Sequence, residues 1–347
     1  MKKTFFAITL ILLISACSEP KPLNSEHIIA FGTLISLTTY GISRQKTQQA
    51  ANKLQQQFNQ MHQDWHVWEA GELFNLNANL STQTPTVVSH DLLTIIQKSQ
   101  QLSQQSDQLF NPAIGHLIGL WGFHKDDIEN KHFPPQQAIR KSLKSAPSMQ
   151  DLSITGKTVS TGNTHVKLDF GGVAKGYGIR LAIQTLKKMN IHNAIINAGG
   201  DLQAIGNAGD RQWSIGIRDP LSTSKVKMIA RLEINDDESV FTSGGYERYF
   251  EYQGKKYSHI IDPRTGYPAN TSLSSTVVHP DPAIADAAAT ALFIAGAEGW
   301  LKIIKQMGLT QVLLIDKDNR FYITKQLLGR IEFSEFANQQ EMVVYPN

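Results

Sequence analysis

The stretch LDFGGVAKGYG (residues 168–178) carries the pattern of a strand end, a glycine turn and a helix start. Apolar and polar residues alternate just before it and predict a strand over 165–170. Gly171 and Gly172 then predict a turn, and the following helix carries Lys175 in its first turn. Backbone N–H groups are unpaired at a helix N-terminus, and glycine lets a ligand come close to the main chain. This arrangement suits a nucleotide phosphate beside a metal ion, although an ordinary glycine-rich turn has the same pattern.

The rest of the chain mixes helix and strand patterns without strict βαβ order. Apolar residues at helical spacing predict helices over 45–61, 92–102 (capped by Ser89), about 173–189 and 282–296. Alternating or apolar runs predict strands over 28–40, 158–160, 194–197, 213–217, 227–234, 246–252, 274–279, 311–315 and 321–324. Because strands outnumber helices and often follow one another directly, we expect an α+β fold with largely antiparallel sheets rather than a Rossmann domain.

Composition limits the class of protein. The chain has 347 residues, of which 41% are hydrophobic, enough for a substantial core in one or two domains. Its formal net charge is +3, without the basic tail or stripe of a nucleic-acid-binding protein, so we expect no nucleic-acid partner. No P-loop, CxxC, HExxH or GxSxG motif occurs, which removes support for zinc-hydrolase and serine-hydrolase interpretations.

The N-terminus has the pattern of a processing signal. Lys2 and Lys3 precede an apolar run over 5–14, and the sequence ISAC that ends at Cys17 resembles the bacterial lipobox. We therefore expect residues 1–16 to be a lipoprotein signal peptide, Cys17 to be lipidated, 17–26 to be a tether and 27–347 to be the folded domain. This places the protein in the bacterial cell envelope, facing the periplasm, in either the inner or the outer membrane. An ordinary secretory signal with an incidental cysteine is the alternative.

A second group of candidate residues lies in the sequence ADAAAT (residues 285–290). On a helix Asp286 and Thr290 are four residues apart and share one face, and the alanines between them allow close packing. A carboxylate, a hydroxyl and a nearby backbone carbonyl form the all-oxygen environment that Mg²⁺ prefers. An alanine-rich core helix, in which Thr290 bonds back to the preceding turn, is the alternative.

A third group lies in the sequence YSHIIDPRTG (residues 257–266). His259 has an unperturbed pKa near neutrality and precedes Asp262 by three residues, so it is a candidate for moving a proton. Asp262 precedes Pro263 and has an alternative role as a turn acceptor. Arg264 suits either a phosphate or a carboxylate partner.

Taken together and in order, these segments resemble the ApbE family, the FAD:protein FMN transferases. The resemblance covers most of the chain after the signal peptide. It is carried by FGT (31–33), GELFNLN (71–77), FNPAIG and LWGF (within 110–123), LDFGGVAKGYG (168–178), NAGGD (197–201), WSIGIRDP (213–220), TSGGYERYF (242–250), HIIDPRTG (259–266) and ADAAATALFIAG (285–296).

The resemblance implies two lobes with FAD in a cleft between them. It implies Mg²⁺-dependent transfer of FMN from FAD to a threonine, or sometimes a serine, hydroxyl of a partner protein, with release of AMP. The expected acceptors are membrane flavoprotein subunits of the redox-pump type. Hydrolysis of FAD to FMN and AMP, and flavin binding without chemistry, are the alternatives.

The resemblance also assigns roles to individual residues. The metal ligands it implies are the Gly172 carbonyl, Asp286 and Thr290, and we assign His259 as the base or hydroxyl orienter, supported by Asp262. The implied flavin and nucleotide contacts are Phe31, Trp68, Leu109, Phe110, Asn111, Asp169, Lys175 and Ile260. Three positions depart from the family: Asn111 stands where an aspartate is usual, Arg180 occupies a helix position that is often an aspartate, and Ala289 stands where some members have a further acid.

Overall fold

The computed structural model describes residues 22–124, 133–222 and 227–346, so the predicted signal peptide and Cys17 lie outside the described residues. Its helices are α1 (Arg44–Trp65), α2 (Glu72–Ser81), α3 (His90–Gln105), α4 (Gly115–Trp121), α5 (Gln136–Lys144), the 3-10 helix η1 (Met149–Asp151), α6 (Ala174–Lys188), α7 (Pro282–Met307), α8 (Lys325–Leu328) and α9 (Glu335–Asn338). Its strands are β1 (Leu23–Ala30), β2 (Thr33–Tyr40), β3 (Thr86–Val87), β4 (Leu152–Thr155), β5 (Thr158–Thr161), β6 (Ala194–Ala198), β7 (Asp201–Ile205), β8 (Trp213–Arg218), β9 (Met228–Ile234), β10 (Glu238–Gly244), β11 (Tyr249–Tyr252), β12 (Lys255–Ser258), β13 (Ser272–His279), β14 (Val312–Asp316), β15 (Phe321–Thr324), β16 (Ile331–Phe333) and β17 (Met342–Tyr345).

A nine-stranded sheet forms the centre of the molecule, in the order β1-β2-β6-β7-β10-β13-β14-β15-β17. Neighbouring strands in it are antiparallel except β15 and β17, which are parallel. Smaller sheets are formed by β16-β9-β8, by β3-β5-β4 and by the β11-β12 hairpin. The predicted α+β fold with largely antiparallel sheets is therefore confirmed.

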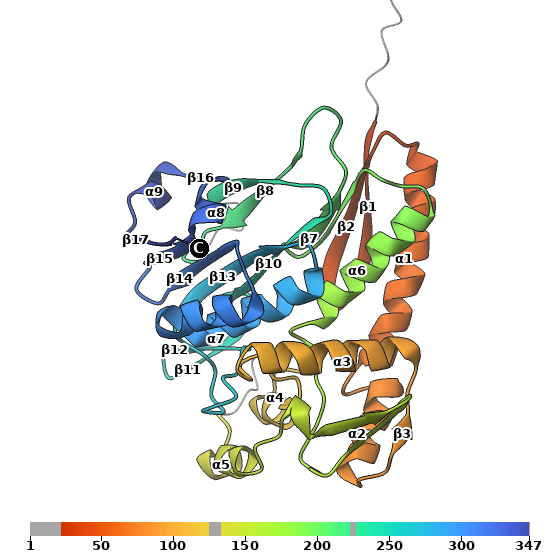
Figure 1. Cartoon of the computed structure of the whole chain (residues 1–347), viewed down its shortest axis with the longest axis vertical. Coiled ribbons are helices and arrows are strands. Elements are labelled where there is room, and N and C mark those ends of the chain that lie inside the picture. Colours follow the sequence, from red (N-terminus) through yellow and green to blue (C-terminus); the bar gives the residue numbers. More distant parts are fainter. Residues whose placement is uncertain (1–21, 125–132, 223–226, 347) are drawn as a thin grey trace, which may run out of the picture.

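The two faces of the large sheet are covered differently. Helices α1, α6 and α7 pack on one face, where side chains such as Leu54, Ile196 and Phe293 form the main core (Figure 1). The β16-β9-β8 sheet covers the other face around Trp213, Leu232 and other buried residues. Strands buried on both sides explain the apolar runs in the sequence.

A second group of elements lies below the sheet in the view of Figure 1, where α3 runs beside α7 and α2, α4 and α5 lie further out. Buried aromatic residues join α4 to the β11-β12 hairpin, with the rings of Trp121 and Phe250 6.1 Å apart. Ser89 caps α3 as predicted, because its hydroxyl accepts a hydrogen bond from the N–H of Leu92.

The segment predicted as one strand over 28–40 is instead a hairpin of β1 and β2. Phe31 and Gly32 form its two-residue turn, with φ angles of 51° and 67°. Positive φ angles at both positions are typical of hairpin turns whose twist matches the twist of the two flanking strands. The predicted tether over 17–26 also ends too late, since β1 begins at Leu23 and pairs with Tyr40. The polar residues at the start of β1 are not buried and are paired with β2 through the backbone, whereas Ile28 and Ala30 at its end are buried in the core.

One further predicted element is absent, and another is followed by a second helical part. The predicted strand over 165–170 is only a bridge between Lys167 and Ile114, because the segment lies against a loop rather than a strand. The helix predicted over 282–296 ends at a kink, because Gly296 is non-helical with φ 62°, and a second helical part of α7 follows to Met307. Within the described residues, α7 alone is long and apolar enough to cross a membrane, yet most of it is buried against β10 and β13.

Candidate functional site

The glycine turn and α6 meet the start of α7. A Cβ atom on Gly176 would lie 2.3 Å from the Pro282 carbonyl oxygen, so only glycine permits this approach of the two helices. The approach brings the Gly176 N–H 2.9 Å from Asp286 Oδ2. Asp286 is buried, and within the described part of the chain no hydrogen bond reaches its other oxygen. The LDFGGVAKGYG segment (residues 168–178) and the ADAAAT segment (residues 285–290) thus come together in one place.

Oxygen atoms from three segments gather beside Asp286. A Cβ atom on Gly172 would lie 3.2 Å from Thr290 Oγ1 and 3.4 Å from a ring carbon of Phe110, so the bare glycine faces the Thr290 hydroxyl. Ser243, at the end of β10, places its hydroxyl 3.3 Å from Thr290 Oγ1. Carboxylate, hydroxyl and carbonyl oxygens are the donors that Mg²⁺ takes, so the residues present fit this cation. No cluster of three or more His, Cys, Asp or Glu side chains suited to a metal occurs among the described residues.

A network of charged groups lies next to these oxygens. Lys175 forms an ion pair with the buried Asp201, whose other oxygen accepts a hydrogen bond of 2.9 Å from the N–H of Thr242. Burial alone would lower the pKa of Lys175, but Asp201, Asp286 and Glu247 together raise it. The lysine is therefore charged at every physiological pH.

Two carboxyl groups of the network hold protons more tightly than usual. Burial, strengthened by the charge of Asp201, raises the pKa of Asp286 to about 7. Desolvation of its carboxyl group also raises the pKa of Glu247 to about 7, with Asp201 and Asp286 adding to the effect, although the residue as a whole is exposed. Removal from water is the main cause of both raised pKa values, and the negative neighbours add a smaller part that Lys175 opposes.

Asp201, Ser243 and Glu247 were not predicted as site residues. Asp201 is brought in by the turn before β7, where Gly199 and Gly200 have φ angles of 69° and 113°. Its signal was the sequence NAGGD, which also fits an ordinary hairpin, and a hairpin of β6 and β7 is what it forms.

Arg218 and Tyr246 border the charged network. The Arg218 guanidinium lies 4.7 Å from the centre of the Tyr246 ring, and its buried Nε has no hydrogen-bond partner in the described structure. Burial raises the pKa of Tyr246, and the negative charge of Glu247 adds to this. The end of β8 therefore adds a second cation beside Glu247.

The aromatic residues expected to contact flavin are held in different ways. Phe31 has the left-handed φ of the β1-β2 turn, a strained conformation for a bulky residue. The centres of the Phe31 and Trp65 rings lie 6.4 Å apart, with 11° between the ring planes. Trp68 stacks on His124 with ring centres 4.0 Å apart, and Lys167 Nζ lies 3.6 Å from the centre of its indole. Groups that close cannot share one face, so both faces of Trp68 are covered.

The expected contacts at 109–111 lie in a loop beside Gly172. Leu109 and Phe110 are buried. The Asn111 amide donates a hydrogen bond of 2.9 Å to the Pro147 carbonyl, and its oxygen accepts one of 3.1 Å from the N–H of Ala113. An ionised aspartate has no proton to donate to Pro147, so the asparagine has a structural role of its own.

Asp169 and Ile260 are two further expected contacts, and both come later in the sequence. The Asp169 carboxylate accepts a hydrogen bond of 2.9 Å from the N–H of Gly171 and so shapes the glycine turn. Burial raises its pKa, although Gly171 and Lys167 oppose the shift. Ile260 is buried, and its carbonyl accepts a hydrogen bond from the N–H of Ala269.

His259 is oriented by the loop that carries Glu247. Its Nδ1 lies 3.0 Å from the Arg248 carbonyl, which also accepts a hydrogen bond from the His259 N–H. Because a carbonyl accepts only, Nδ1 carries the proton and Nε2 is the basic atom of the neutral ring. Asp262 binds Arg264 through both oxygens, at 2.9 and 2.8 Å, and its expected support of His259 stays a prediction.

Comparison with known proteins agrees with this geometry. The model of the ApbE family matches residues 31–314. The chain belongs to the ApbE family. It is 39% identical to the FAD:protein FMN transferase of Rhodobacter capsulatus, over 93% of this chain but 61% of that protein. It is 31% identical to the FAD:protein FMN transferase of Haemophilus influenzae, over 73% of this chain and 74% of that protein.

Solved structures of ApbE proteins have the same fold. The crystal structure of the Thermotoga maritima ApbE protein has a TM-score of 0.77 and 28% identity, covering 92% of this chain and 99% of that one. The flavin transferase ApbE of Vibrio cholerae has a TM-score of 0.76 and 25% identity, covering 89% of this chain and all of that one (100%).

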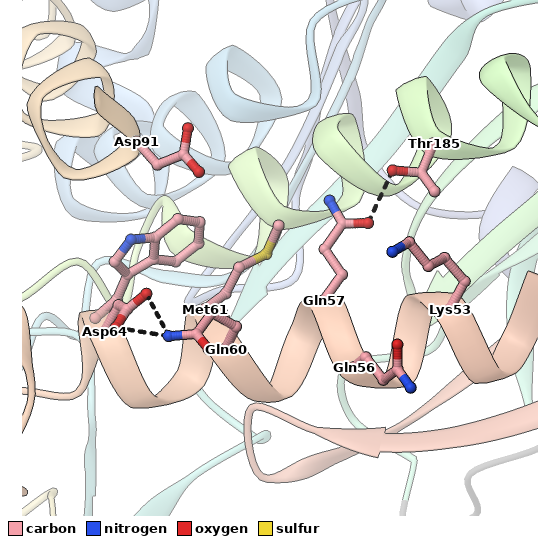
Figure 2. A pocket seen from close by; sticks show the side chains of 9 residues that line it. Lys53, Gln56, Gln57, Gln60, Met61, Asp64, Asp91 and Thr185 are labelled. Carbon is pink, nitrogen blue, oxygen red and sulfur yellow. Dashed lines mark hydrogen bonds between the residues drawn. The ribbon is translucent and has the colours of Figure 1, made fainter. Parts of the chain in front are cut away.

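A cavity of about 370 Å³ lies elsewhere on this ApbE family member, between α1 and α6 (Figure 2). Four of the side chains that line the cavity form hydrogen bonds with each other: Gln57 with Thr185, and Gln60 with Asp64. Trp65 lines it and also contacts Phe31. None of the predicted site residues lines this cavity.

Proposed function

We propose that this chain is an FAD:protein FMN transferase. As a member of the ApbE family it is an enzyme of the flavin-transferase class with FAD as its substrate. The finer proposal is Mg²⁺-dependent transfer of FMN to a threonine or serine hydroxyl of a partner flavoprotein, with release of AMP. The observation that carries it is the meeting of the α6 N-terminus with Asp286 and Thr290.

The charge balance of the site supports a requirement for a cation. Once Asp286 and Glu247 have lost their protons, above about pH 7, the carboxylates of Asp201, Asp286 and Glu247 outnumber the cations Lys175 and Arg218. An anionic pyrophosphate is repelled by such a site unless a cation is added. Asp286, Thr290 and the Gly172 carbonyl would hold Mg²⁺, which when bound neutralises phosphate oxygens.

The remaining residues bind and orient the reactants. Lys175 supplies a fixed positive charge, and the N–H groups at the start of α6 favour an anion. The acceptor hydroxyl oxygen forms a bond to the FMN phosphorus, and the bond from that phosphorus to the bridging oxygen of the pyrophosphate breaks. The bridging oxygen leaves as part of the phosphate group of AMP. His259 Nε2 takes the hydroxyl proton, and the Arg248 carbonyl holds the ring in the tautomer that permits this.

We propose that the protein is anchored in the cell envelope through Cys17 and acts on membrane flavoprotein subunits on the periplasmic side. The folded domain begins at Leu23, six residues after Cys17. A segment of that length reaches at most about 20 Å. The domain would therefore stay close to the bilayer, within reach of acceptors embedded in it.

The test is to incubate the purified full chain with FAD, Mg²⁺ and a membrane flavoprotein subunit that bears an acceptor threonine. Flavin fluorescence that stays with the subunit in a denaturing gel, together with one AMP per flavin, supports the transferase. We expect Asp286→Ala to lower this transfer at least about a hundredfold, and the exposed Asp318→Ala to leave it unchanged. AMP release without labelling would favour the hydrolase, and stable FAD binding without AMP release would favour a flavin carrier.

A further inference from the structure

Asp201 joins three elements of the site through one carboxylate. It begins β7, its Oδ2 binds Lys175 of α6, and its Oδ1 accepts the N–H of Thr242 in β10. The residue is 4% exposed, so water cannot replace either partner. Asp201 therefore fixes the position of the Lys175 ammonium group as well as the end of β10.

Lys175 has other negatively charged neighbours that compete for it. Asp286 and Glu247 both attract the ammonium group, and Asp286 is bound to the N–H of the very next residue, Gly176. The side chain of Lys175 is only 28% exposed, and a carboxylate partner stabilises it because an unpaired charge with little access to water is costly. Without Asp201, Asp286 is the buried carboxylate left for Lys175.

We infer that Asp201 is a positioning residue that holds Lys175 away from Asp286 and so leaves the Asp286 carboxylate available to the divalent cation. This inference rests on the proposed function, since it concerns the same site. It assigns a role to a residue outside the predicted ligand set. In this arrangement Lys175 and the divalent cation both bind the same anionic substrate, and they do not compete for the Asp286 carboxylate.

The experiment measures the affinity of the full chain for Mg²⁺ alone, by titration calorimetry in the absence of FAD. We expect Asp201→Asn to weaken Mg²⁺ binding about tenfold or more, because the Lys175–Asp286 pair must then be broken first. The double variant Asp201→Asn with Lys175→Met removes the competing cation. We expect it to recover an affinity within about threefold of the wild type, although it lacks the lysine needed for transfer.

A matched control is Glu238→Gln, which alters a buried carboxylate paired with a cation at the opposite end of β10. Its Mg²⁺ affinity should equal that of the wild type. Should Asp201→Asn fail to fold, Lys175→Met alone decides the question. That variant should bind Mg²⁺ at least as tightly as the wild type, and weaker binding would contradict the inference.

Two other results would overturn the inference. One is wild-type affinity in Asp201→Asn, and the other is a double variant as weak as the single one. Failure of the proposed function is seen separately: a wild-type chain that binds Mg²⁺ yet labels no acceptor refutes the transferase and leaves the affinity comparison valid. A wild-type chain that binds no Mg²⁺ refutes both the metal assignment and the role of Asp201.

Discussion

Strand β10 has a buried acid–base pair near each of its ends, and the two differ in charge balance. At its start, both oxygens of Glu238 accept hydrogen bonds of 2.7 Å from Arg330, which also donates to the Glu233 carbonyl. Towards its end, Lys175 pairs with Asp201 while Asp286 and Glu247 add two further carboxylates.

The pKa values of the carboxyl groups report this difference. Burial alone would raise the pKa of Glu238, but the hydrogen bonds from Arg330 lower it. At the other end burial raises the pKa of Asp286 to about 7. The first pair is a closed structural contact, whereas the second belongs to a site in which the carboxyl groups outnumber the cations. Strongly raised pKa values of carboxyl groups are typical of functional sites.

Breaking the balanced pair should have the largest effect on stability. We expect Glu238→Gln to lower the free energy of unfolding by roughly 3 kcal/mol, because the Arg330 charge then remains partly buried without its partner. Urea unfolding measures this, with the exposed Arg231→Gln as the control. A change below about 0.5 kcal/mol would mean that the Glu238–Arg330 pair is not structural.

The pH dependence of stability should have opposite signs at the two ends. The lowered pKa of Glu238 means that its stabilisation is present above its unfolded pKa and is lost as the pH falls through the folded value. The raised pKa of Asp286 means that the folded state binds the extra proton between the unfolded value of 3.8 and about 7. Stability of the metal-free protein should therefore decline as the pH rises through this window, by at most about 1.4 kcal/mol per pH unit for one group.

Asp286→Asn removes this titrating group, so its free energy of unfolding should vary less between pH 5 and pH 7, a range set by those pKa values. Urea unfolding at several pH values, with a chelator present, makes the measurement. A variant with the same pH dependence as the wild type would assign the raised pKa to another group.

The smallest expected effect concerns Ser243. Its hydroxyl lies 3.3 Å from Thr290 Oγ1, at the edge of the oxygen cluster, so Ser243→Ala should weaken Mg²⁺ binding by about threefold. Calorimetric titration with Mg²⁺ is the measurement, and Ser239→Ala on the same strand is the control. Loss of all binding would make Ser243 a direct ligand rather than a neighbour of one.

Some features of the fold and the site followed from local spacing alone. The Ser89 cap, the helical stripe of α1 and the shared face of Asp286 and Thr290 depend on residues within two turns of one another. Edge strands and turns were harder to predict, since the polar strand β1 and the bend at Phe31 lack the apolar alternation of a central strand.

The sequence by itself determined the periodicity of each element, the glycines where chains come close, and the acid and hydroxyl of α7. Only the tertiary structure decided that Asp201 binds Lys175, that Glu247 lies beside them, and that both faces of Trp68 are covered. The physical reason is that spacing along one element fixes only the neighbours within a few residues. Contacts such as the hydrogen bond from the Gly176 N–H to Asp286, 110 positions later in the sequence, depend on how the helices and the sheet pack together.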